Sequence, residues 1–523
     1  MSNQTYTYEL IPITPLHVGD GNTLQSNLDF TVNKFAFEVR DLDAMFRKLY
    51  QDNPKAFAEL NHLEFDLGKF ISTYKIKDIV KYSLPLKGSN LRSGHGRHIK
   101  EVRSFVKNGL GQPYLPGSSL KGAIYTDLLV SALQNNHALN SGYKELERQI
   151  KQLFGDPQQS RMRAIQVSDT NPLDFEQLGV YELKIFNLKS ETEAGWKSFS
   201  TRQNIPDFRQ ATSLYVEAVC PEVSVYGQIK LDRFLFQTSV EKLANLKGYK
   251  FNGLPEITAQ INQCSLDTVK RELDFLQKFS THLGKVIEFY EDLEKKIKGL
   301  DENSCILRMS WGVGWKGMTG DWLRGTSLER IRREAGLGKI FCPDCDKSIY
   351  FQRNTGRFYC RNCEKRIAPN QVKLFPIFPK TRRFALKDGI PSLPMGWVEL
   401  RFLDKDVFYK FKPKKTTQNE TTVQASRPVQ PKPKVDPEKE RKEKLERFIQ
   451  NINLQKFGAE INTYLEQIKT TADEKLKQDM CKYLLDKAKS LPNKKQRYDK
   501  ALKQNKKWAL QLKNLAEKVL GQD

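Results

Sequence analysis

The first residues of the chain alternate between polar and apolar side chains, which predicts a strand over 3–18 that ends in a loop. Two more strands are predicted over 28–33 and 34–40, and residues 42–51 have the apolar spacing of a helix. Residues 212–231 alternate like paired strands. A ferredoxin-like βαββαβ unit is one fold that contains strands and helices in this order. The pattern therefore predicts an α+β protein.

Apolar residues recur at helical spacing in three other parts of the chain. They do so after Lys121, which predicts an amphipathic helix, and over 266–299, which predicts a long helical region. Residues 411–437 are rich in Lys, Pro, Thr and Gln and have almost no apolar side chains, so we expect a flexible linker. Helical spacing returns from about residue 438 among many lysines, which predicts a small basic helical bundle.

Charge and cysteine content narrow the class of protein. The formal net charge is +24 and the pI is about 9.5, so we expect a polyanion as a partner. No stretch has the apolar length of a membrane span and the N-terminus has no signal-peptide pattern, so no membrane partner is expected. The eight cysteines include two tight Cys-x-x-Cys pairs, which suit a reducing compartment and predict a cytoplasmic location.

These two cysteine pairs are the most specific chemical motif in the sequence. They consist of Cys342, Cys345, Cys360 and Cys363, and a short β-hairpin that turns at 354–356 fits between them. The spacing predicts a zinc ribbon in which four thiolates complete a tetrahedral site. Because no coordination position stays open for a substrate, we expect the zinc ion to be structural. A redox-active pair is the alternative, but it does not require the second pair.

A Pro/Gly-rich loop leads into an apolar helix within residues 112–124. Between Gly117 and Lys121 the sequence predicts a helix start, with Ser118 or Ser119 as the N-cap. Free backbone N–H groups, small residues and a lysine suit an anion, and in a basic chain we first consider a nucleic-acid phosphate. An ordinary loop-to-helix junction with a surface lysine explains the same residues equally well.

Two further segments combine glycine or positive charge with aromatic residues. The glycines within 306–320 allow the backbone to approach a phosphate closely, and Trp311 and Trp315 can stack on bases or pack in the core. Residues 83–111 are basic, and Phe105 within them and Tyr114 just after them interleave with the charges, which suits single-stranded RNA. A solvated charged loop has the same composition.

Several separate motifs, in the order in which they occur, resemble the RAMP superfamily. They are TPLHVGDG, PYLPGSSLKGAI, LFGD before a strand that ends in VSDT, WGVGWKGMTG, and FPKTRRF with PMGWVEL. In their order and their residues, these motifs are most similar to the fifth Csm subunit of type III-A CRISPR effector complexes. The resemblance implies tandem ferredoxin-like (RRM-like) RAMP domains. Together with the patterns above, it predicts domains at 1–235 and 236–410, a zinc-ribbon insertion at 338–370, the linker at 411–437 and a basic helical domain at 438–523.

This resemblance implies a non-catalytic CRISPR RNA-binding subunit that caps the complex near the 3′ end of the guide and supports guide maturation. The implied partners are CRISPR RNA, target RNA, the neighbouring RAMP backbone and small helical subunits, and host exonucleases. Three features depart from the family pattern: Tyr125 stands where an Arg is usual, the ribbon is inserted, and the helical tail is additional. The candidate RNA contacts are His17, Gly19, Arg92, Arg97, Arg103, Gly117, Ser118, Ser119, Lys121, Arg308, Gly312, Gly314, Lys316, Gly317, Lys380 and Arg382.

A RAMP endoribonuclease that cleaves guide precursor or target RNA is the alternative function. Asp29 or Asp20 would then support metal-assisted cleavage, or a histidine would act as the general base. The candidate histidines are His17, His95 and His98. Asp20 lies in a predicted turn, where local hydrogen bonding explains it, and Asp29 has no evident carboxylate partner for a metal. The sequence therefore favours binding over catalysis.

Overall fold

The computed structural model consists of two compact units, Met1–Thr416 and Thr417–Asp523. It describes residues 4–26, 28–33, 36–58, 67–88, 99–134, 143–201, 203–237, 240, 245–248, 251, 253–319, 325–403, 437–450, 452, 457–471, 473–491, 497–504 and 506–521. Within these residues no helix is both long enough and apolar enough to cross a membrane. Most of the predicted linker lies outside them.

The first sheet of the larger unit is antiparallel throughout. Its strands, in spatial order, are β13 (Ser304–Arg308), β21 (Trp397–Leu403), β1 (Gln4–Pro12), β12 (Val225–Leu231) and β7 (Ile165–Val167). Tyr8 on β1 lies opposite both Gly227 and Phe402. The predicted boundary between residues 235 and 236 thus lies inside one compact unit, whose first sheet pairs strands from both sides of it.

Long helices pack beside this sheet and complete an α+β fold, as the sequence predicts. They are α4 (Gly117–Gln134), α7 (Leu254–Leu276) and α8 (Ser280–Lys298). Helix α7 packs on α4, on α8 and on β13, and the apolar faces of α4 and α7 enter the main hydrophobic core with the inward residues of the sheet. Burial of these faces supplies most of the driving force that holds helix and strand together.

The second sheet has eleven strands and is organised around β8, whose residues are all buried. Its main path runs β2 (Gly19–Gln25), β6 (Glu101–Phe105), β11 (Ser213–Val219), β8 (Leu178–Leu188), β5 (Val80–Lys87), β4 (Ala36–Arg40) and β3 (Phe30–Val32). The strands β19 (Thr381–Lys387), β20 (Ile390–Pro394), β9 (Ala194–Lys197) and β10 (Asn204–Ile205) extend it. The strands predicted over 28–33 and 34–40 are β3 and β4, which pair antiparallel, and the rings of Phe30 and Phe37 lie 4.5 Å apart.

Shorter helices flank these sheets. They are α1 (Leu42–Asp52), α2 (Pro54–Ala58), α3 (Leu67–Thr73), α5 (Tyr143–Phe154), α9 (Gly314–Thr319) and α10 (Gly325–Ala335). Helix α1 begins after Asp41, whose side chain accepts a hydrogen bond from the backbone N–H of Ala44 and so caps the helix.

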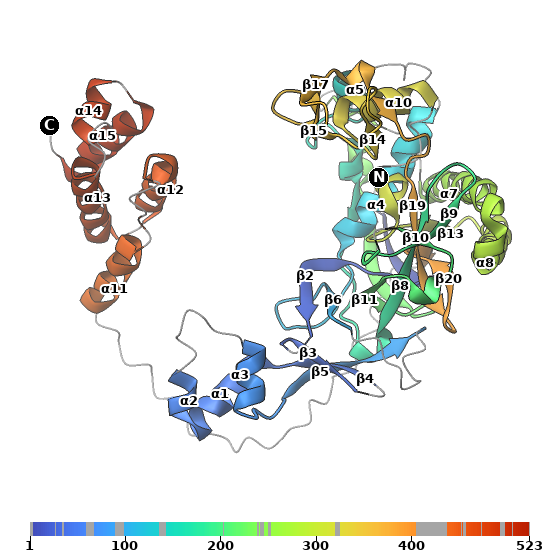
Figure 1. The fold of residues 1–523 in the computed structure, drawn as a ribbon, viewed down its shortest axis with the longest axis horizontal. Helices are drawn as coiled ribbons and strands as arrows, with labels where there is room; N and C mark the ends of the chain where they lie inside the picture. Colours follow the sequence, from blue (N-terminus) through green and yellow to red (C-terminus); the bar gives the residue numbers. More distant parts are fainter. Residues whose placement is uncertain are drawn as a thin grey trace. The chain divides into compact units, whose positions relative to one another are not determined.

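The cysteine motif forms a small ribbon next to α10 (Figure 1). A two-stranded sheet of β14 (Ile340–Phe341) and β18 (Lys373–Leu374) forms its base, and a three-stranded sheet contains β15 (Tyr350–Gln352), β16 (Arg357–Cys360) and β17 (Lys365–Ile367). The guanidinium groups of Arg332 and Arg333 on α10 donate hydrogen bonds to the carbonyl oxygens of Phe375 and Val372. These bonds attach the ribbon to the rest of the unit.

The smaller unit is helical in all its described secondary structure, as its apolar spacing predicts. It contains α11 (Pro437–Gln450), α12 (Phe457–Thr470), α13 (Glu474–Lys489), α14 (Tyr498–Lys503) and α15 (Lys507–Leu520). These helices share a core of their own, which includes Phe457, Ile468 and Leu484. A separate core is what a helical bundle needs in order to fold as one unit.

Candidate nucleic-acid interface

Trp311 lies at the centre of a cluster of cationic and aromatic side chains. Its loop joins β13 to α9, and its backbone N–H donates a 3.1 Å hydrogen bond to the carbonyl oxygen of His17. The guanidinium carbons of Arg103 on β6 and Arg383 on β19 lie 5.1 and 5.2 Å from the centre of the indole ring. Both distances are within the range of a cation–π interaction. Four segments far apart in the sequence therefore meet at one ring.

The two arginines of this cluster have different surroundings. Arg103 is exposed, whereas burial, with a further contribution from the charge of Arg103, lowers the pKa of Arg383. Among the described residues, the Nε of Arg383 is buried without a hydrogen-bond partner. A donor left in this state is costly unless a ligand supplies an acceptor. The cluster can therefore bind an anion through the arginines and stack a planar ring near Trp311.

A pocket of about 220 Å³ lies beside this cluster, between α4, α7, the glycine-rich loop and β19. The structure brings six of the predicted contact residues together in its wall: Arg308, Gly312, Gly314, Lys316, Gly317 and Arg382. Arg383 also lines it, together with the carboxylates of Asp127 and Glu272. The charged groups of the wall are thus mostly cationic, with two carboxylates among them.

Arg382 is occupied by contacts within the protein. Its Nε and Nη2 donate hydrogen bonds of 2.7 and 2.9 Å to the two carboxylate oxygens of Glu272, and its Nη1 reaches the carbonyl oxygens of Pro379 and Thr381. Burial alone would raise the pKa of Glu272, but the charge and hydrogen bonds of Arg382, together with the charges of Arg308 and Lys316, outweigh it and hold the pKa below its usual value. Arg382 therefore shapes the pocket wall, and its neighbour Arg383 is the cation better placed to bind a ligand.

Asp127 on α4 is the second acidic group of the pocket. Its Oδ2 is inaccessible and has no hydrogen-bond partner among the described residues. Burial raises the pKa of this carboxyl to about 7, although a hydrogen bond with Cys264 acts in the opposite direction. Asp127 therefore adds less than a full negative charge to the pocket near neutral pH.

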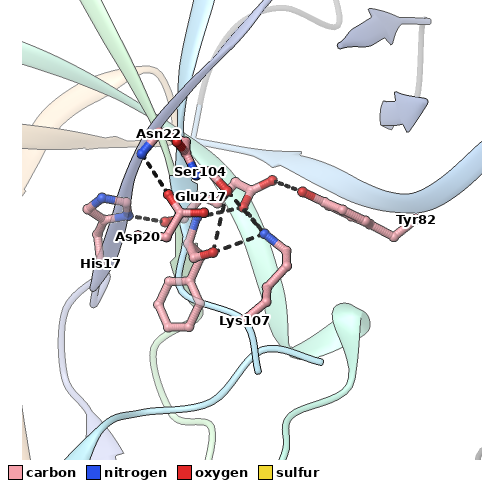
Figure 2. A network of polar contacts seen from close by, with 8 residues as sticks. His17, Asp20, Asn22, Tyr82, Ser104, Lys107 and Glu217 are labelled. Carbon is pink, nitrogen blue, oxygen red and sulfur yellow. Dashed lines mark hydrogen bonds and ion pairs between the residues drawn. The ribbon is translucent and has the colours of Figure 1, made fainter. Parts of the chain in front are cut away.

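Figure 2 shows His17 in a polar network centred on Glu217. The Nδ1 of His17 donates a 2.6 Å hydrogen bond to the carbonyl oxygen of Glu217. The carboxylate of Glu217 accepts hydrogen bonds from the Tyr82 hydroxyl at 2.6 Å, the Phe105 backbone N–H at 2.7 Å and the Lys107 Nζ at 2.9 Å. Burial lowers the pKa of His17 to about 4. A neutral, buried imidazole adds no positive charge to the interface at neutral pH, and its Nδ1 proton is already used.

The four cysteine sulphur atoms of the ribbon lie within 4.8 Å of one another. The Sγ atoms of Cys342 and Cys363 are 3.9 Å apart, and those of Cys345 and Cys360 are 3.5 Å apart. A tetrahedral ion with metal–sulphur bonds of about 2.3 Å requires sulphur–sulphur distances of about 3.8 Å. The backbone N–H of Cys363 also donates a hydrogen bond to the Sγ of Cys360, as is common around thiolate ligands. This arrangement fits a metal ion with four sulphur ligands.

Comparison with known proteins identifies the family. Residues 9–315, more than half of the chain, match the model of the RAMP superfamily. The chain belongs to the RAMP superfamily. This confirms the prediction from the sequence motifs.

One curated protein similar to this RAMP chain is the CRISPR system protein Csm5 of Streptococcus thermophilus. The two are 27% identical over 193 residues, and the match covers 34% of this chain and 54% of the relative. The chain thus spans about half the length of the curated relative it matches.

Two solved structures are also similar to the chain. One chain in a cryo-EM structure of a Csm–crRNA–target RNA ternary complex of a type III-A CRISPR-Cas system has a TM-score of 0.49 and 23% identity. That match covers 76% of this chain and 100% of the other. The crystal structure of T. onnurineus Csm5 has a TM-score of 0.41 and 19% identity, and it covers 75% of this chain and 99% of the other.

The N-terminus of helix α4 differs from the prediction in its cap and in the partner of its first backbone N–H group. Helix α4 begins at Gly117, so Ser118 and Ser119 lie in its first turn and do not cap it. The Asp169 carboxylate accepts a 2.8 Å hydrogen bond from the Gly117 N–H. A Cβ at Gly117 would lie 2.4 Å from the carbonyl oxygen of Ser168, so this glycine permits close packing. A protein carboxylate thus already occupies one donor of the predicted anion site.

The other predicted contacts are spread over the fold. Burial lowers the pKa of Lys121 and of Lys380, whose Nζ lies 5.2 Å from the centre of the Phe375 ring. Arg308, already described in the pocket wall, donates a hydrogen bond to the carbonyl oxygen of Met395. Gly19 begins β2, where an added Cβ would lie 3.0 Å from the His17 Nε2. Arg92 and Arg97, like His95 and His98, lie outside the described residues.

Tyr125 and the two candidate aspartates make local contacts. The Tyr125 ring packs edge-on against Phe154, with the ring centres 5.4 Å apart. Asp20 lies in strand β2, at the register irregularity between Gly19 and Thr23, and not in the predicted turn; it accepts a hydrogen bond from the Asn22 N–H. Asp29 accepts one from the Gln25 N–H. These bonds give each aspartate a role in local chain geometry.

The sequence motifs do not single out Arg383 as a contact, and they allow Trp311 either to stack on bases or to pack in the core. Arg382 and Arg383 are adjacent on β19, and consecutive residues of a strand point to opposite faces. Which of the two arginines faces Trp311 depends on the register of β19 with β8, and sequence periodicity does not define that register.

A pH-dependent stability difference is expected from His17. Its pKa of about 4 in the folded chain lies below the value of about 6.5 for an unfolded chain, so the unfolded state binds more protons between these values. As the pH falls from 7 to 5, this histidine should therefore lower the free energy of unfolding by about 2 kcal/mol. Urea unfolding at both pH values should show this loss in the wild type and not in His17→Asn.

His282 provides the control for this measurement, because it is exposed on α8. His282→Asn should keep the pH dependence of the wild type. Other groups, Asp127 among them, affect both proteins equally and cancel in the comparison. Equal pH dependence in His17→Asn and the wild type would contradict the depressed pKa.

Proposed function

We propose that the chain is a non-catalytic guide-RNA-binding subunit of a type III CRISPR effector complex. It caps the complex near the 3′ end of the guide and supports guide maturation, with CRISPR RNA, target RNA, neighbouring backbone and small helical subunits, and host exonucleases as partners. Membership in the RAMP superfamily and the similarity to a CRISPR system protein support this proposal. The net charge of +24 provides the electrostatic attraction to a polyanion.

The observation that carries the proposal is the cluster around Trp311. Arg103 is exposed beside the ring, and Arg383 has a buried donor without a partner among the described residues. A phosphate placed at these two guanidinium groups would satisfy that donor and relieve their mutual repulsion. Stacking of a base near the indole would add to the affinity without selecting a sequence. This combination suits the backbone of a guide whose sequence varies.

The two arginines give a direct test. Arg103→Ala and Arg383→Ala are each expected to weaken binding of a guide RNA by about tenfold, because each removes a charge-assisted contact. Each should also reduce the salt slope of log K by about 0.7 if it removes one phosphate contact. Fluorescence anisotropy with labelled guide RNA across a salt series measures both quantities.

Lys285→Ala is the matched control, because it removes one positive charge from the exposed face of α8. It should leave both affinity and slope close to the wild type. Unchanged binding in both arginine variants would count against this cluster as the RNA site. The same mixtures, incubated with and without Mg²⁺ and resolved on a gel, test for cleavage. Cleavage lost on Asp29→Ala would favour the endoribonuclease function.

We also propose that the sulphur cluster holds a structural zinc ion. The four sulphur ligands and their separations support zinc, for which tetrahedral thiolate sites are usual. The ribbon core is small and includes Ile340, Ile349 and Phe358, so metal binding would provide much of its stability.

A further inference from the structure

The three-stranded sheet of the ribbon has one apolar face and one polar, aromatic face. Phe351 and Phe358 lie opposite each other across β15 and β16, and Phe358 lies opposite Ile367 on β17. These three side chains pack in the ribbon core. Neighbouring positions point the other way, because side chains alternate along a strand. This second face, called the ribbon face below, consists of Tyr350, Gln352, Arg357, Tyr359 and Arg366.

Two tyrosines lie side by side on the ribbon face. The ring centres of Tyr350 and Tyr359 are 5.6 Å apart, and the rings are inclined by 59°. Tyr350 is 43% exposed, so much of its ring is open to solvent. Because the rings are inclined, each can hold a different base. Tyrosines on an open sheet face are the stacking surface that several single-strand-binding folds use.

Arginines surround these rings. The guanidinium carbon of Arg361 lies 5.4 Å from the centre of the Tyr350 ring, and Arg366 lies opposite Tyr359 in the register of β16 and β17. Arg357, Arg361 and Arg366 are all exposed. In the described part of the chain no carboxylate pairs with any of these three, whereas Asp344 and Asp346 pair with Lys365 and Lys373. The positive charge of the ribbon face is therefore left for a partner.

We propose that the ribbon face is a second RNA-binding surface, which stacks bases of single-stranded RNA on Tyr350 and Tyr359 and contacts their phosphates through the surrounding arginines. A double helix does not fit this chemistry, because its bases are already stacked. The choice of RNA over DNA rests on the proposed function. The surface itself is separate from the Trp311 cluster, since it is formed entirely by residues 350–366.

The test uses the full zinc-loaded chain and a labelled oligouridine of about twelve nucleotides, a length that one single-strand-binding surface can cover. Tyr350→Ala and Tyr359→Ala should each weaken binding about tenfold through lost stacking, whereas Tyr350→Phe and Tyr359→Phe keep a ring and should bind like the wild type. An abasic oligonucleotide of equal length should bind the wild type and both Ala variants equally. Zinc content shows whether each variant keeps the ribbon.

Photo-crosslinking locates the contact without any substitution. A 4-thiouridine oligonucleotide irradiated with the wild-type chain should crosslink to the peptide that contains Tyr350 or Tyr359. The same crosslink should persist in Arg383→Ala, so that failure of the Trp311 site and failure of the ribbon face are distinguishable. Absence of ribbon crosslinks, or equal binding by the Ala and Phe variants, would overturn the proposal. Equal affinity for double-stranded RNA would overturn stacking as its basis.

Discussion

Cys360→Ser is expected to remove the bound zinc and unfold the ribbon while the rest of the larger unit stays folded. Cys360 is almost fully buried, and its Sγ lies 3.5 Å from that of Cys345. Apparent binding free energies of structural zinc sites are about 10–16 kcal/mol, far more than the small ribbon core can replace. Metal analysis should find about one zinc per chain in the wild type and background levels in the variant. Trypsin should then cleave the variant rapidly at Arg353 or Arg357.

Cys220→Ser is the matched control, because Cys220 is a free cysteine outside the ribbon. It should retain about one zinc per chain and the proteolytic resistance of the wild type. A chelator added to the wild type should reproduce the cleavage pattern of Cys360→Ser. A wild-type ribbon that is free of zinc yet resistant to trypsin would contradict the structural role of the metal.

Glu217→Ala is expected to lower the free energy of unfolding of the larger unit by about 3–5 kcal/mol. The carboxylate is fully buried, and it accepts hydrogen bonds from Tyr82, from the Phe105 backbone and from Lys107. Truncation would leave the ammonium group of Lys107 without its partner carboxylate in a largely buried position. Urea unfolding followed by tryptophan fluorescence measures this unit, since five of the six tryptophans lie before residue 416.

An exposed ion pair provides the comparison for Glu217. Glu193 pairs with Lys189 at 2.8 Å, but both side chains are mostly exposed. Glu193→Ala should therefore unfold at nearly the same urea concentration as the wild type, because water solvates the remaining lysine. If Glu217→Ala behaved like Glu193→Ala, the buried network would not be the stabilising element that its geometry indicates.

Local patterns predicted those features that depend on neighbouring residues. Strands β3 and β4 follow from their alternating side chains, and both lie close to their predicted ranges. The helix over 42–51 follows from its apolar spacing, and the structure has it as Leu42–Asp52. The ribbon follows from the spacing of Cys342, Cys345, Cys360 and Cys363, because the metal ligands lie within 22 residues of one another.

The first turn of α4 includes a hydrogen bond that local sequence patterns do not predict. The residues from Gly117 to Lys121 indicate a helix start with free donors, and the helix does begin there. The partner of the first donor is Asp169, which is 52 residues away. No local signal connects the two, because their contact depends on how β7 packs beside α4.

The α+β class, the RAMP family and the cysteine cluster follow from short motifs and periodicity, so they can be read without a structure. Which cations face a common site depends instead on how the chain folds. Arg103, Trp311 and Arg383 come together because β6 and β19 belong to one sheet and the loop after β13 reaches it. In the same way, the pairing of Arg382 with Glu272 decided which of two adjacent arginines is occupied. Such contacts depend on strand register and helix packing, which the whole chain establishes together.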